Sequence, residues 1–185
     1  MPENIQKIDE AILFFIQAHI KNPALDRVMV FITSLGNAGF IWLAAAFILL
    51  LLKRYRKCGI SLICTIPLSM FICDNLLKPF FSRVRPCNKF PEVLMLIHRL
   101  PSPSFPSGHT TVSFASAVIL YYYNKKLGIA GFITASLIAF SRLYLFVHYP
   151  TDILGGILLG TACSAALLYG LNKIYPELEN LPLSS

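Results

Sequence analysis

The chain has 185 residues, of which 56% are apolar, and its mean hydropathy is +0.65. Soluble proteins average roughly 45 to 50% apolar residues, so the composition excludes an ordinary soluble domain and indicates an integral membrane protein. The net charge of +7 comes from short basic clusters between apolar runs and forms no stripe that would bind nucleic acid.

The domain organisation follows from the absence of an internal repeat or a linker in the sequence. We expect one membrane domain over residues 1–185, divided into an N-terminal segment (1–35), a helical bundle (36–173) and a tail (174–185). Residues 1–4 lack the features of a signal peptide, so we expect the first segment to remain in the protein. The five cysteines show no paired spacing typical of zinc sites or disulfide frameworks, and no sequence signal indicates an oligomeric state.

Two short segments precede the first strong apolar run. Residues 5–20 carry apolar side chains at helical spacing with charged residues between them, which is typical of an amphipathic helix lying in the membrane interface. Asn22-Pro23 ends this helix, a second apolar piece covers residues 24–35, and residues 36–39 form a turn. This pattern fits either one broken span or a surface hairpin.

Five strong apolar runs follow, at residues 40–52, 58–77, 110–123, 127–147 and 153–171. They predict an all-α, polytopic transmembrane bundle of five spans, with the N-terminal segment as a sixth if it crosses. Basic clusters at residues 53–57 and 125–126 and at Lys173 fall on one side if the spans alternate. The positive-inside rule places that side in the cytoplasm. The long loop of residues 78–107 is then extracytoplasmic.

Three polar clusters share this extracytoplasmic face, where ionisable groups beside apolar runs indicate a functional site. They contain three cations suited to binding phosphate, namely Lys78, Arg85 and Arg142. Ser107 has an N-cap position at the start of the third strong run, and Gly108 lets a ligand approach the backbone.

The remaining members of the clusters are His109, His148 and Asp152. Pro150 predicts a helix start, so His148 lies just before a helix N-terminus, where an anion is favoured. Two histidines and a carboxylate can supply a nucleophile, a general acid and an orienting group. The residue types therefore predict covalent phosphoryl transfer.

The clusters resemble the three signature motifs of the type-2 phosphatidic acid phosphatase family. The matching residues are Lys78, six residues, Arg85-Pro86; Pro106-Ser107-Gly108-His109; and Ser141-Arg142, five residues, His148, three residues, Asp152. The resemblance implies that His148 attacks phosphorus and forms a phosphohistidine, that Asp152 holds its ring, and that His109 protonates the leaving oxygen. It also implies that the phosphoryl oxygens are bound by Lys78, Arg85, Ser107, Gly108 and Arg142, without a metal or cofactor.

In its small size and its short amphipathic N-terminal segment, the chain resembles the bacterial undecaprenyl-diphosphate phosphatases of that family. The resemblance implies hydrolysis of undecaprenyl diphosphate to undecaprenyl phosphate and phosphate at the outer face of a bacterial cytoplasmic membrane. The motifs equally fit a phosphatidylglycerophosphate, phosphatidic acid or lipid A phosphatase. An alternative of a different class is a lipid or anion carrier without catalysis.

Some of the charges have other interpretations. The histidines and the aspartate can hold zinc, although three nearby cations would repel a divalent metal. Lys78 can pair with Asp74, four residues earlier on the same helix. Arg83, Lys89 and Arg99 can contact a diphosphate or lipid headgroups, and we interpret each of them in preference as a solvated loop charge.

Overall fold

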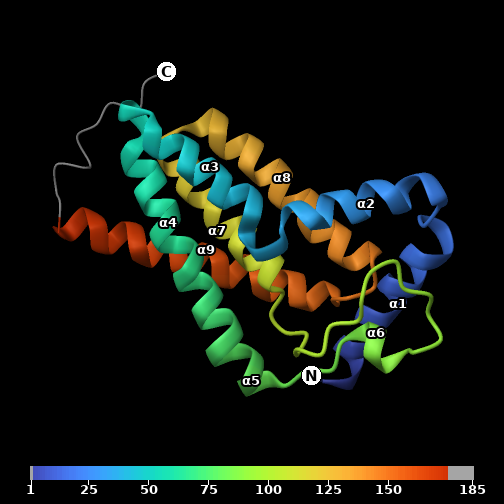
Figure 1. The fold of residues 1–185 in the computed structure, drawn as a ribbon. Helices are drawn as coiled ribbons and strands as arrows, with labels where there is room; N and C mark the ends of the chain where they lie inside the picture. Colours follow the sequence, from blue (N-terminus) through green and yellow to red (C-terminus); the bar gives the residue numbers. More distant parts are fainter. Residues whose placement is uncertain (1, 175–185) are drawn as a thin grey trace.

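The computed structural model describes residues 2–174, and the regular elements within that range are all helical (Figure 1). The longer helices are α1 (Glu3–His19), α2 (Pro23–Leu35), α3 (Phe40–Leu51), α4 (Arg56–Phe71), α7 (Gly108–Tyr123), α8 (Lys125–Tyr144) and α9 (Pro150–Ile174). The shorter ones are η1 (Asn37–Gly39), η2 (Lys53–Tyr55), the π-helix η3 (Ile72–Leu77), α5 (Lys78–Phe81) and α6 (Pro86–Lys89). The predicted all-α fold is confirmed, and the predicted tail lies outside the described residues from position 175 onward.

The helix breaks in the N-terminal region follow local chemistry. Asn22 caps α2 by accepting hydrogen bonds from the backbone N–H groups of Ala24 and Leu25, and Pro23 fits the first helical position. α2 and α3 are bent by 51° at a short break that contains η1. Ala38 and Gly39 have positive φ there, which ends the helical path. The candidate for a broken span is therefore the pair α2 and α3.

Within residues 2–174, three helical stretches are long and apolar enough to cross a membrane: Lys53–Lys89, Lys125–Tyr144 and Pro150–Lys173. The bent pair of α2 and α3 makes a fourth if it counts as one span. The sequence predicted five spans. Two of the predicted runs form α3, with 12 residues, and α7, with 16 residues. Both are shorter than the roughly 20 residues that a straight crossing needs.

α1 is amphipathic as predicted, and the side that faces the protein carries the carboxylate of Asp9 beside the apolar Leu13 and Ile16. Asp9 is 1% exposed, whereas Ile8 and Phe15 are 61% and 56% exposed. The buried side packs Leu13 against Phe146, and Figure 1 places α1 beside α6 and the loop that precedes α7. An outward apolar side fits lipid surroundings, and an inward carboxylate fits contact with protein partners.

α7 packs against α8, α9 and α4 (Figure 1). The packing is close because glycines face it. A Cβ on Gly128 of α8 would lie 2.2 Å from the Cα of Tyr121, and one on Gly160 of α9 would lie 2.3 Å from the carbonyl oxygen of Thr111. Small residues let helix backbones approach in membranes. Since α7 begins beside Ser107, these contacts also position the polar end of the bundle.

We predict that Gly160→Ala destabilises the protein by about 1 to 3 kcal/mol, because the new methyl group meets the backbone of α7. Gly170→Ala on the same helix is the matched control, since nothing lies within 4 Å of a Cβ there. Thermal unfolding in detergent, followed by tryptophan fluorescence, measures both. Equal midpoints for the two variants would contradict the close-packing argument.

Candidate active site

A cavity of about 210 Å³ lies at the polar end of the bundle. Six of the eight predicted site residues line it, namely Lys78, Arg85, Gly108, His109, Arg142 and His148. They come from α5, the residue before α6, α7, α8 and the segment before α9, so segments far apart in sequence meet here. Asp152 and Ser107 do not line the cavity, and both side chains are completely buried.

Two buried arginines and a lysine give the cavity its positive charge. Arg85 is 2% exposed and is held by Ser102, whose backbone oxygen accepts from Nε at 2.7 Å and whose hydroxyl accepts from Nη2 at 3.0 Å. Arg142 donates from Nη1 to the Thr33 hydroxyl, while its Nε has no hydrogen-bond partner within residues 2–174. Lys78 pairs with Asp74 at 2.7 Å, which confirms that predicted pairing.

His148 is oriented from both of its ring nitrogens. Nε2 lies 2.9 Å from Nη1 of Arg85, and Nδ1 lies 3.4 Å from Oδ2 of Asp152. Because a guanidinium can only donate, Nε2 must be the unprotonated nitrogen of a neutral ring and Nδ1 carries the proton. Burial, and then the positive charge of Arg85, lower the pKa of His148 from its ordinary 6.5 to about 3. The ring is therefore neutral, with a lone pair on Nε2 at the cavity.

The carboxylate of Asp152 is fixed by several donors. Its Oδ2 accepts from the backbone N–H of Tyr149 at 2.8 Å and from the hydroxyl of Ser104. Ser104 is also 3.5 Å from Nδ1 of His148. Nothing in the sequence singled out Ser104, because isolated serines are common in loops and its partners are 44 and 48 residues away.

The start of α7 forms another wall of the cavity. Ser107 is its N-cap as predicted, and its hydroxyl oxygen accepts from the backbone N–H of Thr110 at 3.5 Å. The Ser107 backbone N–H donates to the carbonyl oxygen of Asp152 at 3.1 Å, which joins the starts of α7 and α9. A Cβ on Gly108 would lie 3.7 Å from Nζ of Lys78, so glycine keeps this space open beside the lysine.

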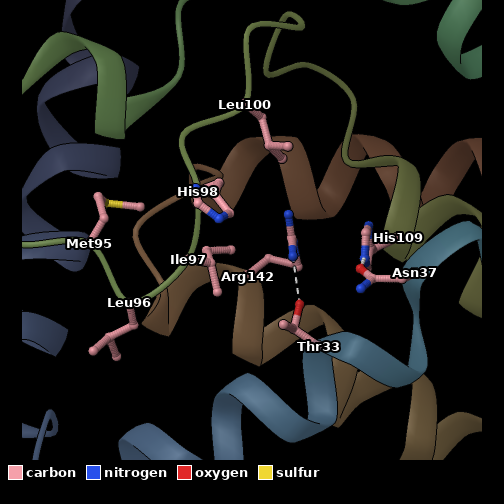
Figure 2. A pocket seen from close by; sticks show the side chains of 9 residues that line it. All are labelled: Thr33, Asn37, Met95, Leu96, Ile97, His98, Leu100, His109 and Arg142. Carbon is pink, nitrogen blue, oxygen red and sulfur yellow. Dashed lines mark hydrogen bonds between the residues drawn. The ribbon is translucent and has the colours of Figure 1, made fainter.

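A second cavity of about 590 Å³ adjoins the first and shares His109, Arg142 and Leu100 with it. Figure 2 shows His109 and Asn37 on one side of this second cavity and the loop residues Met95 to His98 on the other. His109 Nε2 is 3.1 Å from the side-chain oxygen of Asn37. Sequence reasoning placed Asn37 only in a turn, and its contact with His109 spans 72 residues.

The interpretation of Arg83 as a solvated loop charge is wrong. Its side chain is 9% exposed and forms ion pairs with both Asp9 and Asp152. The other two loop cations are more open. Lys89 is 45% exposed in an ion pair with Glu10, and the exposed Arg99 donates to backbone oxygens of its own loop.

A family model described as the PAP2 superfamily matches residues 59–176. The chain belongs to the PAP2 superfamily. This confirms the resemblance that the three motifs carry. The protein is thus a membrane phosphatase of the PAP2 type, built from several apolar helices.

Individual PAP2 relatives have different names. The chain is 33% identical over 150 residues to an undecaprenyl-diphosphatase of Sulfolobus acidocaldarius, with 80% of this chain and 72% of the relative covered. It is 36% identical over 189 residues to phosphatidylglycerophosphatase B of Bacillus subtilis, with 94% and 85% covered. The crystal structure of a PAP2-type phosphatidylglycerolphosphate phosphatase from Bacillus subtilis superposes with a TM-score of 0.78 at 29% identity, covering 93% of this chain and 88% of that one.

The hydrogen bond from Arg85 predicts a specific ionisation state for His148. Without phosphate, its ring should stay neutral from pH 6.5 down to about 3, because burial and Arg85 both disfavour imidazolium. Histidine-selective ¹⁵N NMR in detergent should show one ring with an unprotonated Nε2 at pH 5. Absence of this signal in His148→Gln assigns it. A His148 signal that titrates with a midpoint near 6.5 would contradict the prediction.

Proposed function

We propose that this PAP2 protein hydrolyses undecaprenyl diphosphate to undecaprenyl phosphate and inorganic phosphate at the extracytoplasmic face of a bacterial cytoplasmic membrane. The observation that carries the proposal is the unprotonated Nε2 of His148 facing a cavity lined by Lys78, Arg85 and Arg142. A neutral nucleophile within a ring of cations suits attack on a phosphoryl group, since phosphoryl transfer needs mainly positioning and charge stabilisation.

In the first step, the terminal phosphoryl group occupies the smaller cavity. One of its oxygens accepts the hydrogen bond that Nη1 of Arg85 now donates to Nε2 of His148, which frees the lone pair of Nε2. Nε2 then attacks phosphorus, the N–P bond forms, and the bond from phosphorus to the leaving oxygen breaks. Asp152 stabilises the positive charge that develops on the ring, because its Oδ2 faces Nδ1. His109 donates a proton to the leaving oxygen where that oxygen needs one.

In the second step, water attacks phosphorus and His109 takes up the proton of that water. The N–P bond breaks, phosphate is released, and His148 returns to its neutral form. His109 suits both steps because it lines the two cavities and its ring is held by Asn37. Its position separates the space for the transferred phosphoryl group from the space for the leaving group.

The second cavity supports a diphosphate lipid as substrate. An in-line displacement places the leaving group opposite His148, and the larger cavity, which adjoins the smaller one at His109 and Arg142, offers space for it. Arg142 lines both cavities, so its guanidinium can contact both phosphates of a diphosphate. Met95, Leu96 and Ile97 offer apolar contacts for the first part of a lipid tail.

A phosphatidylglycerophosphate phosphatase is the second candidate, favoured by the relative and the crystal structure from Bacillus subtilis. The same two cavities accept a glycerolipid phosphate, with the glycerol in place of the second phosphate. Phosphatidic acid and lipid A remain further substrates to test. The carrier alternative lacks support, because a carrier has no need of a neutral histidine aligned with a carboxylate.

Phosphate release from four purified lipids tests the substrate assignment: undecaprenyl diphosphate, phosphatidylglycerophosphate, phosphatidic acid and lipid A. We predict the highest kcat/KM for the diphosphate, because its second phosphate is joined directly to the first and can lie beside Arg142. His148→Ala should lower kcat by at least about 10³-fold, since the nucleophile is removed.

His19→Ala is the matched control for that variant, since His19 is exposed on α1, bonds to the backbone oxygen of Phe15 in its own helix and stacks on the Phe15 ring. Preference for a glycerolipid phosphate would overturn the substrate while keeping the chemistry. Lipid binding without turnover in the unmodified protein would favour a carrier and overturn the proposal.

Metal independence is part of the same proposal. Lys78, Arg85 and Arg142 already supply positive charge to the cavity, and Asp152 is directed away from it toward Ser104 and Arg83. We therefore predict that excess EDTA leaves kcat unchanged in the phosphate-release assay. Loss of turnover that zinc restores would revive the zinc interpretation of the histidines and the aspartate.

A further inference from the structure

We infer that Arg83 is a positioning residue for the reaction, and that Asp9 of α1 holds Arg83 in place. The N-terminal helix would then be part of the catalytic apparatus rather than only a contact with the membrane interface. The inference rests on the proposed function, which gives Asp152 the task of orienting His148. Neither Arg83 nor Asp9 belongs to the three motifs that carry the family resemblance.

Arg83 connects α1 with the start of α9 through both ends of its guanidinium. Nη1 donates to Oδ1 of Asp152 at 2.6 Å and to the hydroxyl of Thr151 at 2.7 Å. Nη2 donates to Oδ2 of Asp9 at 2.6 Å and to the side-chain oxygen of Gln6 at 2.7 Å. The guanidinium also lies 4.0 Å from the ring centroid of Tyr149. Few side chains other than arginine could reach all of these acceptors at once.

The two oxygens of Asp152 have separate partners. Oδ1 accepts from Arg83, whereas Oδ2 faces Nδ1 of His148, the backbone N–H of Tyr149 and the hydroxyl of Ser104. A carboxylate with both oxygens anchored cannot rotate about its last side-chain bond. Arg83 therefore fixes the plane of the carboxylate and so the direction in which Oδ2 meets the imidazole.

Asp9 joins α1 to the start of α9 as well as to Arg83. Its Oδ1 accepts from the backbone N–H of Thr151 at 3.0 Å, and its Oδ2 accepts from the Thr151 hydroxyl as well as from Arg83. Thr151 follows Pro150 in the first turn of α9, where a carboxylate also favours the helix N-terminus. Asp9 thus binds the same helix turn that carries Asp152.

Charge explains why the guanidinium is needed. Two carboxylates are buried beside it, with Asp9 at 1% and Asp152 at 0% exposure. Without Arg83, Asp152 would face Asp9 with no cation between them, and burial would favour protonation of a carboxylate. A protonated Asp152 no longer offsets the positive charge that forms on His148 during attack.

Arg83 acts through Asp152 and does not reach the phosphoryl group. It does not line the smaller cavity, where Lys78, Arg85 and Arg142 provide the cations. Its loss should therefore lower the rate of the chemical step while leaving phosphate binding intact. This separates it from Arg85, which is only two residues away in sequence but contacts His148 at Nε2.

The test compares Arg83→Gln, Arg83→Lys and Asp9→Asn with the unmodified protein, using the best substrate of the lipid panel. We expect Arg83→Gln to lower kcat by about 100-fold, with KM and the inhibition constant of inorganic phosphate within about threefold of the unmodified values. Arg83→Lys should recover part of the loss, because an ammonium can bind one of the two carboxylates. Asp9→Asn should lower kcat by about tenfold, since Arg83 keeps its contact with Asp152.

Lys89→Gln is the matched control. Lys89 forms the other ion pair between α1 and this loop region, with Glu10 at 2.5 Å, and has no contact with Asp152. The kcat of Lys89→Gln should stay within about threefold of that of the unmodified protein. A loss confined to the Arg83 variants would then come from the position of Asp152 and not from weaker packing of α1. Thermal unfolding midpoints and detergent gel filtration report whether each variant is folded.

If the unmodified protein is active and Arg83→Gln has the same kcat, the inference is overturned and the proposed function stands. Equal losses of kcat in Arg83→Gln and Lys89→Gln would also overturn it, because docking of α1 would then be the cause. A rise in KM together with weaker inhibition by inorganic phosphate, at nearly unchanged kcat, would also overturn it, because Arg83 would then bind the phosphate itself. Inactivity of the unmodified protein toward the whole panel would overturn the proposed function, and this inference with it.

Discussion

The arrangement of this site depends on one buried carboxylate and the donors that surround it. Asp152 is fully buried and accepts hydrogen bonds from a guanidinium, a hydroxyl and a backbone amide, besides facing the ring of His148. Leaving a buried anion without partners costs several kcal/mol, so these donors must be in place before the ring can be held. These donors come from three separate parts of the chain. Their hydrogen bonds to Asp152 therefore fix the loop before α6, the loop before α7 and the start of α9 relative to one another.

A membrane environment explains why the N-terminal helix α1 can contribute a buried carboxylate to the contacts around Arg83. In water an amphipathic helix keeps its large apolar side chains inside, whereas α1 turns Ile8 and Phe15 outward and buries Asp9 beside Leu13 and Ile16. Lipid accepts the apolar side chains without cost, and the protein interior supplies Arg83 and Thr151 for the carboxylate. The same rule accounts for the centre of the bundle, where glycines of α8 and α9 bring backbones close to α7. Close packing replaces the hydrophobic effect that would otherwise hold such helices together.

The two adjoining cavities divide the proposed reaction into a place for chemistry and a place for recognition. The smaller cavity has the cations and the His148 nitrogen proposed as nucleophile, and its donors suit any phosphoryl group. The larger cavity is lined by the loop residues Met95 to His98 together with Thr33 and Asn37 (Figure 2). Differences among PAP2 relatives that are named for different lipids would then arise mainly on the side of the leaving group. His109 and Arg142, which line both cavities, connect the two tasks.

The sequence by itself determined the membrane class, the helical fold, the family and six of the residues that line the smaller cavity. Apolar runs of helical length and fixed motif spacings are local signals, and Ser107 as an N-cap and Pro150 as a helix start act over only a few residues. Only the tertiary structure decided the roles of Ser104, Asn37, Arg83 and Asp9, whose site partners lie 44 to 142 residues away. The sequence shows Arg83 only as a charged loop residue, which predicts solvent exposure, because its buried partners are distant in sequence. Helix packing brought Asp9 of α1 and Asp152 of α9 to the same guanidinium, and no local pattern encodes a contact over that distance.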